Sequence, residues 1–255
     1  MRIIGTIARY TVVEALHTRL PLLVGCVILV LVAASLFAAE LAIAEGARFQ
    51  AAIYAAGVRL AGVFIVGLYV LASMAREFDD RGLDTVLALD LTRGQYLLGK
   101  LAGFLAIGAL VAATATVPLA PSATPGALLQ WGLSLCLELS IVVAFSLFCI
   151  VSLGQVMMAA SVMVGFYLLA RTLTAVRLMA ASPISGADSL PHQVMHWVTE
   201  GVALLIPGFD HWTRTAWVVD APAPWLDIAV LAGQGMLYVA LLAAASMFDF
   251  YRRNF

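Results

Sequence analysis

The residues of this chain that most resemble a catalytic motif are two glycines followed by a lysine. Gly94 and Gly99 precede Lys100 in the segment GQYLLGK, which has the glycine–lysine spacing of a phosphate-binding loop. The next residue is Leu101, where such a loop needs a serine or threonine hydroxyl to hold magnesium. No strand pattern precedes the segment, whereas a phosphate cradle presents free backbone N–H groups after a strand. We therefore expect no ATPase site in this chain.

A second candidate for chemistry is a group of histidines in the C-terminal third. His192 and His196 stand four residues apart, a spacing that could place both on one helix face for a metal ion. The alternative is that they are polar residues at a membrane interface, because tryptophans alternate with them as in an aromatic belt. We favour the interface and expect no metal. The group comprises His192, His196 and His211 with Asp188, Glu200 and Asp210, and the tryptophans are Trp197, Trp212 and Trp217.

Two charged residues lie inside apolar stretches. Arg59 and Glu138 would each cost ~3 kcal/mol near the centre of a bilayer, so such residues usually face protein or a cavity. They could pair with each other or with a second copy, or contact a polar substrate, and we expect Glu138 to face the interior. The chain has no HExxH, no GxSxG and no aspartate pair in an apolar stretch, so we expect no enzyme.

The composition indicates which solvent surrounds these residues. The chain has 255 residues, of which 63% are hydrophobic and 11% charged, and its mean hydropathy is +1.01. A soluble domain carries roughly twice that charged fraction, so most of the chain must face lipid. The net charge of −1 gives no basic field for nucleic acid. Cys26, Cys136 and Cys149 form no CxxC pair, which argues against a metal or disulfide framework.

The apolar stretches predict an all-α membrane protein with six spans in a single domain, residues 1–255. A spanning helix needs ~20 mostly apolar residues. Residues 1–19 mix apolar and charged residues and suit a helix lying in the membrane interface, although a cleaved signal peptide is the alternative. The predicted spans are residues 20–39, 53–74, 101–118, 128–151, 156–173 and 225–248.

The basic residues predict the orientation in the membrane. With the N-terminus in the cytoplasm, the inside holds more basic residues than the outside, and six spans place both termini there. The expected location is a bacterial inner membrane, with residues 174–224 as a long external loop. The inside set is Arg2, Arg9, Arg19, Arg76, Arg81, Arg93, Lys100, Arg252 and Arg253; the outside set is Arg48, Arg171, Arg177 and Arg214.

The loop between the second and third spans is unusually polar. Residues 76–100, the polar island, hold five of the 15 acidic residues of the chain and four of its 14 basic ones. Residues 76–89 have the pattern of an amphipathic helix, with an apolar face of Leu83, Val86 and Leu87. Thr92 and Gln95 have the spacing of a capping box that would begin the next helix. We expect Lys100 to extend its ammonium toward the membrane surface.

The polar island resembles the corresponding loop of type-2 ABC transporter permeases. The family usually has a proline near the position of Asp90, and here Gly94 follows the arginine, so the turn geometry differs. The LLIPGFD stretch at residues 204–210 is also similar to permeases associated with multicopper-enzyme maturation. The matching residues are Glu77, Gly82, Leu83, Leu87, Thr92, Arg93, Tyr96, Leu97, Gly99 and Lys100.

The resemblance implies a type-2 ABC exporter fold that pairs as a homodimer and binds two copies of a cytoplasmic ATPase. Re-entrant helices are implied in the external loop, and a cytoplasmic coupling helix in the polar island would dock in a groove of the ATPase. ATP and magnesium would bind that partner, and this chain would carry no cofactor. The implied coupling residues are Glu77, Asp80, Arg81, Gly82, Leu83, Asp84, Val86, Leu87, Thr92 and Arg93.

Two functions follow from these expectations. The first is the permease subunit of an ATP-driven exporter. The alternative is a membrane assembly or mechanotransmission subunit that serves a periplasmic maturation partner without moving a small substrate. The sequence does not indicate a substrate for either function.

Overall fold

The computed structural model describes residues 2–42, 45–79, 92–181, 206–220 and 222–252, together with Trp197 and Gly201. Every regular element in these parts of the chain is a helix. The elements are α1 (Arg2–His17), α2 (Leu20–Leu41), α3 (Gly46–Asp79), α5 (Arg93–Thr116), η1 (Val117–Leu119), α6 (Pro125–Leu153), α7 (Val156–Ala181), η2 (Phe209–His211), α9 (Ala216–Val219) and α10 (Trp225–Arg252).

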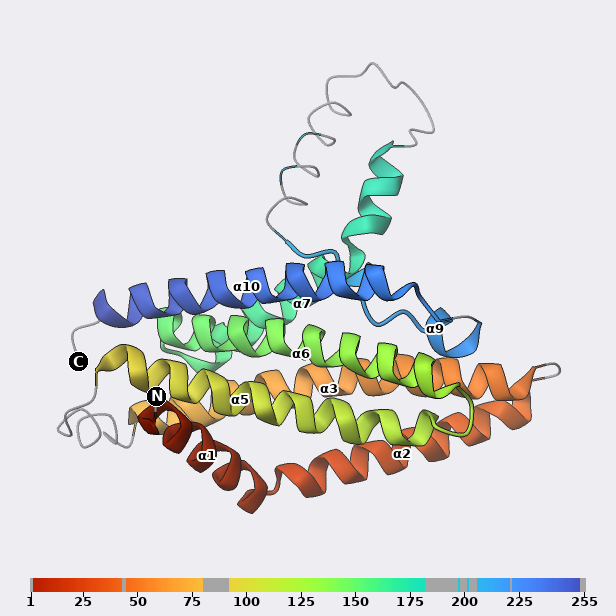
Figure 1. Cartoon of the computed structure of the whole chain (residues 1–255), viewed down its shortest axis with the longest axis horizontal. Helices are drawn as coiled ribbons and strands as arrows, with labels where there is room; N and C mark the ends of the chain where they lie inside the picture. Colours follow the sequence, from red (N-terminus) through yellow and green to blue (C-terminus); the bar gives the residue numbers. More distant parts are fainter. Residues whose placement is uncertain are drawn as a thin grey trace.

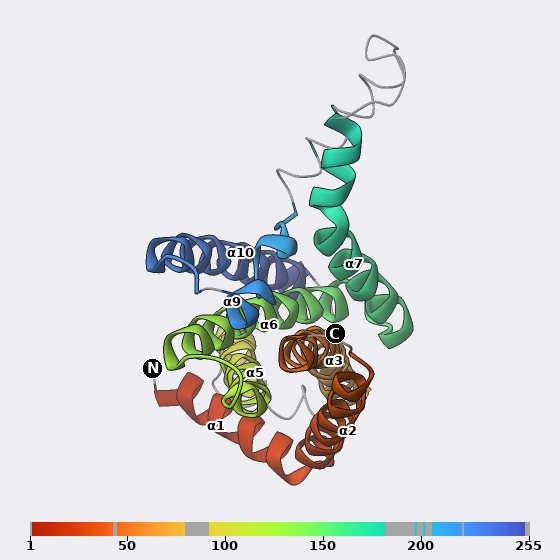
Figure 2. The ribbon, with the colours of Figure 1, turned by 90° about the vertical axis from the view of Figure 1, so that its right-hand side faces the viewer.

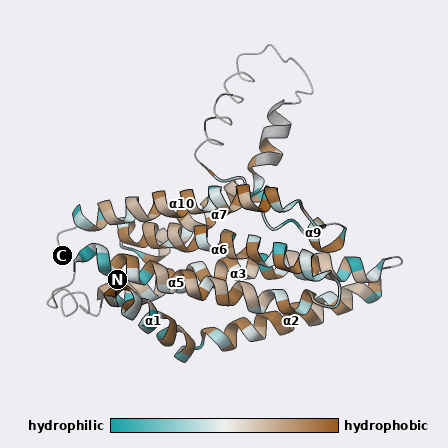
Figure 3. Cartoon of the chain, viewed as in Figure 1, coloured by the Kyte–Doolittle hydropathy of each residue, from teal (hydrophilic) through white to brown (hydrophobic). Residues whose placement is uncertain are grey.

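Six helices, α2, α3, α5, α6, α7 and α10, are long and apolar enough to cross a membrane. They confirm the helical class, and each of them overlaps one of the six predicted apolar stretches. Figure 3 shows hydrophobic residues along most of their length. All six helices extend beyond the predicted apolar stretches, and three of them do so by seven residues or more: α3 begins at Gly46, α5 begins at Arg93, and α7 continues to Ala181. Hydropathy marks only the apolar part of a helix, whereas its backbone hydrogen bonds continue through polar residues.

Local side-chain signals set several helix ends. The Thr92 hydroxyl accepts a hydrogen bond from the backbone N–H of Gln95, whose side chain accepts from the Thr92 N–H, so the expected capping box begins α5. At the start of α6 the Thr124 hydroxyl accepts a hydrogen bond from the Ala127 N–H, ahead of a proline at the first helical position. Gly154 ends α6 with φ 72°, in the left-handed region that a residue without a side chain adopts most easily.

Helix α6 forms the centre of the bundle. It contacts α3, α5, α7 and α10, and Figure 2 shows it surrounded by these helices. In the most apolar part of α6, 72% of the residues are buried, against 6% in α2 and 11% in α10. Helices α2 and α10 are therefore peripheral, and the apolar side chains on their outer faces are exposed to the surroundings of the bundle. A polar side chain on the inner face of α6 must find its partners within the protein.

Helix α1 packs closely against α5, at the end of the bundle where α5 begins (Figure 1). A β-carbon added to Gly103 would lie 2.6 Å from Cβ of Thr11, and one added to Gly99 would lie 2.7 Å from Cβ of Ile7. Real β-carbons do not approach so closely, so the two glycines let the α1 backbone rest on α5. Apolar side chains on the opposite face of α1, such as Tyr10 and Leu16, are exposed. The position of α1 relative to a lipid surface stays a prediction.

The segment of residues 206–220 returns from the long loop into the bundle. It contains η2, which contacts α7, and α9, which contacts α3 and α6. The Thr213 hydroxyl donates a hydrogen bond to Glu138 on α6. At 1.5 Å per residue, Glu138 lies about 20 Å along α6 from the first residue of that helix. The segment then runs outward to α9 and α10 (Figure 1). The parts of this segment outside η2 and α9 need side-chain partners for their backbone inside the bundle, and α3, α6 and α7 provide them.

Candidate functional site

The two helices that flank the polar island are joined by a carboxylate. Glu77 lies in the last turn of α3, and its Oε1 atom is 2.6 Å from Nζ of Lys100 on α5. The second oxygen, Oε2, accepts a hydrogen bond of 2.7 Å from the hydroxyl of Tyr96 on α5. Both carboxylate oxygens are therefore engaged by α5. The end of α3 and the beginning of α5 form one connected unit.

The position of Lys100 corrects one sequence-based expectation. Lys100 does not extend toward the membrane surface but is 5% exposed. Its ammonium group lies between Glu77 and the Oε2 atom of Glu14 on α1, which is 3.9 Å away. Two carboxylates from neighbouring helices replace the water that the ammonium would otherwise reach by extending outward. The ion pairs thus connect α1, α3 and α5 at one end of the bundle.

The first turn of α5 is also tied to α10. Nη1 of Arg93 donates to the Phe250 carbonyl oxygen at 3.4 Å, and the Gly94 N–H donates to the Tyr251 hydroxyl at 3.3 Å. A β-carbon at Gly94 would lie 2.9 Å from Cε of Met247, so this glycine allows α10 to approach. Gly94, which the sequence analysis associated with a turn, lies inside helix α5 at a close contact.

The structure thus describes three of the expected coupling residues, Glu77, Thr92 and Arg93, and places them around the ends of the polar island. The amphipathic helix expected in the island falls outside the described residues, and its docking role stays a prediction. The coupling residues outside the description are Asp80, Arg81, Gly82, Leu83, Asp84, Val86 and Leu87.

A second polar network surrounds Glu138 in the middle of the bundle. Glu138 is fully buried. Its Oε1 atom accepts a hydrogen bond of 3.0 Å from the hydroxyl of Tyr167 on α7. Its Oε2 atom accepts one of 2.5 Å from the hydroxyl of Thr213. The carboxylate therefore faces the protein and links α6 to both α7 and the segment of residues 206–220.

Thr213 connects the two intramembrane charges that the sequence singled out. Nη1 of Arg59 donates to the Thr213 carbonyl oxygen at 2.9 Å, while the Thr213 hydroxyl donates to Glu138. The Thr213 N–H donates to Oγ of Ser134 on α6 at 2.8 Å. Arg59 and Glu138 thus meet through Thr213, not as a direct ion pair. Thr213 has φ 44°, an uncommon value for a β-branched residue, and its hydrogen bonds to α3 and α6 hold it there.

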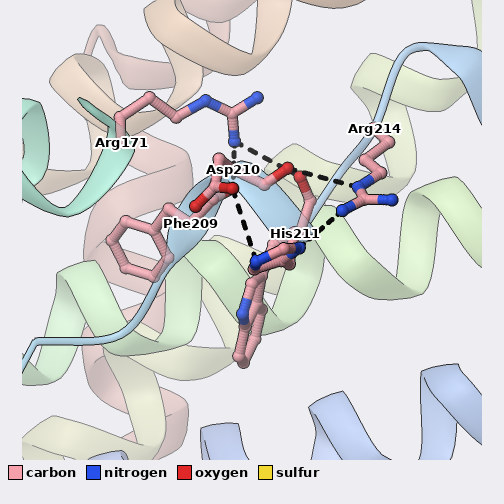
Figure 4. A network of polar contacts seen from close by, with 6 residues as sticks. Arg171, Phe209, Asp210, His211 and Arg214 are labelled. Carbon is pink, nitrogen blue, oxygen red and sulfur yellow. Dashed lines mark hydrogen bonds and ion pairs between the residues drawn. The ribbon is translucent and has the colours of Figure 1, made fainter. Parts of the chain in front are cut away.

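Arg171 on α7 holds the same segment from another side (Figure 4). Its Nη1 atom donates to the carbonyl oxygens of Phe209 and of Trp212, the latter at 3.2 Å. The Phe209 and Trp212 side chains are buried and their rings pack edge to face. Arg171, which the sequence analysis counted in the outside set, lies near the end of the apolar part of α7, and its charge is directed at backbone oxygens.

Of the histidine group, the structure describes His211 and Asp210. The Nε2 atom of His211 is 3.5 Å from Oδ2 of Asp210, and its Nδ1 atom is 2.5 Å from Nη2 of Arg214. Figure 4 shows this ring between the two side chains. His192 and His196 lie outside the described residues. Within the described chain no group of three or more histidine, cysteine, aspartate or glutamate residues could hold a metal ion.

Sequence reasoning found Arg59 and Glu138 because charges in apolar stretches are conspicuous. It missed Ser134, Tyr167 and Thr213, since uncharged hydroxyls leave no comparable signal. The two networks have different effects: one joins the helices around the polar island, and the other fixes the segment of residues 206–220 in the middle of the bundle. No model of a protein family matches this chain, and no curated protein matches it either.

Proposed function

We propose that this chain is the transmembrane permease subunit of an ATP-binding-cassette exporter of the type-2 class. Two features support the proposal: the polar-island motif between residues 77 and 100, and six helices long enough to span a membrane. The chain would pair as a homodimer in a bacterial inner membrane with both termini in the cytoplasm. Two copies of a separate ATPase would bind ATP and magnesium, and the chain itself would catalyse no reaction.

The observation that carries the proposal is the link between Glu77 and α5. A subunit driven by a docked partner needs a rigid path from the docking loop to its spans. Glu77 lies in the last turn of α3 and contacts both Lys100 and Tyr96 in the first turns of α5. A force on the polar island would therefore reach two spans together, and reach α1 through Glu14 and α10 through Arg93. An ordinary solvated loop would not require such links at both of its ends.

The test is the ATPase activity that accompanies the protein. The tagged full chain is purified in a mild detergent from native membranes, and magnesium-dependent, vanadate-sensitive ATP hydrolysis and the stoichiometry of co-purifying ATPase are measured. The double substitution Leu83→Glu with Leu87→Glu places charges on the predicted apolar face and should abolish both. Thr85→Glu, on the opposite face of the same predicted helix, is the matched control and should retain both. An equal amount of ATPase on both variants would overturn the proposed docking.

The alternative function, mechanical service of a periplasmic maturation partner, would share the ATPase. A flux assay in vesicles separates the two, because only an exporter couples ATP hydrolysis to movement of a solute. Reconstituted complex that hydrolyses ATP and moves no candidate from a panel of lipids, glycans and small organic molecules, yet retains a periplasmic protein, would favour the alternative.

A further inference from the structure

A groove opens on the side of the bundle where the corner between α1 and α2 lies against α3. Its volume is ≈ 390 Å³. The walls are apolar over most of their length, with Leu20 and Leu23 from α2 on one side and Phe64 and Leu68 from α3 on the other. Two arginines, Arg19 and Arg76, line the same groove. The groove therefore combines an apolar channel with two positive charges.

The corner that carries Arg19 is fixed by its neighbour. The Thr18 hydroxyl donates to the Ala15 carbonyl oxygen at 2.6 Å and accepts a hydrogen bond of 3.3 Å from the Leu20 N–H. These bonds close the short turn between α1 and α2, and Pro21 lies in the first turn of α2. Arg19 consequently projects from a defined turn. Arg76 projects from a continuous helix, α3.

The two guanidinium groups are available for an anion. Arg19 and Arg76 are exposed, and within the described parts of the chain neither forms an ion pair. The carboxylates of Glu77 and Glu14, which flank this end of the bundle, face the Lys100 ammonium. Arginine is the side chain best suited to a phosphate, because its planar fork donates two parallel hydrogen bonds.

We propose that this groove binds one anionic phospholipid, with its phosphate between Arg19 and Arg76 and an acyl chain along Leu23, Phe64 and Leu68. Basic pockets between spans on the cytoplasmic side are sites for anionic headgroups, and the arginines lie at the end of the bundle that the basic residues place there. An apolar wall alone would accept any lipid. The two charges select a lipid with net negative charge over a zwitterionic one, whose own cation opposes them. This inference is independent of the proposed ATPase partnership.

The test is lipid retention by the purified full chain in detergent, measured by native mass spectrometry. The protein is titrated with phosphatidylglycerol and, separately, with phosphatidylcholine of the same acyl chains. We expect clearly tighter retention of phosphatidylglycerol. The double substitution Arg19→Gln with Arg76→Gln should weaken it by roughly 25-fold, or about five-fold for each arginine near a membrane surface.

The matched control removes two other arginines on the same predicted side. Arg9→Gln with Arg252→Gln lowers the net charge equally and leaves the groove intact, so phosphatidylglycerol retention should stay unchanged. Should the double groove variant not fold, Leu23→Trp keeps both arginines and narrows the groove, and it should reduce retention of phosphatidylglycerol. Equal retention of the two lipids by the wild type, equal losses in the groove and control variants, or unchanged retention in a folded groove variant or in Leu23→Trp would each overturn the proposal.

Discussion

The Nζ atom of Lys100 lies 2.6 Å from the Oε1 atom of Glu77, and this contact joins α5 to the last turn of α3. The lysine is almost completely buried, while the Glu77 side chain is 30% exposed. The ammonium therefore depends on this carboxylate more than the carboxylate depends on the ammonium. The weaker contact with Glu14, at 3.9 Å, cannot replace it.

This asymmetry predicts unequal effects of two glutamate substitutions. Glu77→Gln leaves the buried ammonium of Lys100 without its close partner, so we expect a loss of about 1–3 kcal/mol in the free energy of unfolding. Glu14→Gln removes a distant, half-exposed partner and should cost ~0.5 kcal/mol or less. Unfolding titrations in mixed detergent micelles measure both values. Equal losses for the two variants would show that Lys100 does not depend on the contact with Glu77.

The contact between α1 and α5 predicts that a single methyl group is harmful at Gly103. In Gly103→Ala the new β-carbon would overlap Thr11 at 2.6 Å and the Ala8 carbonyl oxygen at 3.0 Å. We expect a loss of about 1–3 kcal/mol and faster tryptic cleavage after Arg9, because α1 must move away from α5. Gly165→Ala on α7 is the control, since nothing lies within 4 Å of its added carbon. A stable, protease-resistant Gly103→Ala protein would contradict the close packing.

The hydroxyl of Thr213 predicts how firmly the segment of residues 206–220 is held. Thr213→Val keeps the shape of the side chain but removes the hydrogen bond to Glu138, at a cost of about 1–3 kcal/mol for an unsatisfied buried acceptor. Hydrogen exchange of residues 206–220 should therefore accelerate. Thr215→Val is the matched control, because the Thr215 side chain makes no capping hydrogen bond. Identical exchange in the two variants would argue against the anchoring role.

Two substitutions of Glu138 separate a structural role from a transport role. Glu138→Leu removes both acceptor oxygens and leaves the buried Tyr167 and Thr213 hydroxyls without their hydrogen-bond partner. At about 1–3 kcal/mol for each unsatisfied group, we expect a loss of roughly 2–6 kcal/mol in the free energy of unfolding. Glu138→Gln keeps one acceptor oxygen and should cost less. Stability and flux are measured on both. A Glu138→Gln protein of normal stability without flux would place the carboxylate in transport, whereas a Glu138→Leu protein unchanged in stability, assembly and flux would remove both roles.

The helices and several of their ends could be predicted because their causes are local. An apolar run of about twenty residues requires a helix in lipid wherever it occurs. The capping box at Thr92 acts between residues three apart in the chain, and it is present where its spacing predicts it. The outer limits of α3 and α7 were missed because hydropathy does not report polar turns that continue a helix.

The sequence by itself determined the solvent of this protein, its helical class, its six candidate spans and the two charges that needed partners. Only the tertiary structure decided which partners they have. Thr213 and Glu138 stand 75 positions apart, and Arg59 and Thr213 stand 154 apart, so no local pattern links them. Lys100 likewise turns inward only because α1 and α3 bring carboxylates beside α5. Burial of a polar group depends on what packs against it, and that is settled when helices distant in sequence meet.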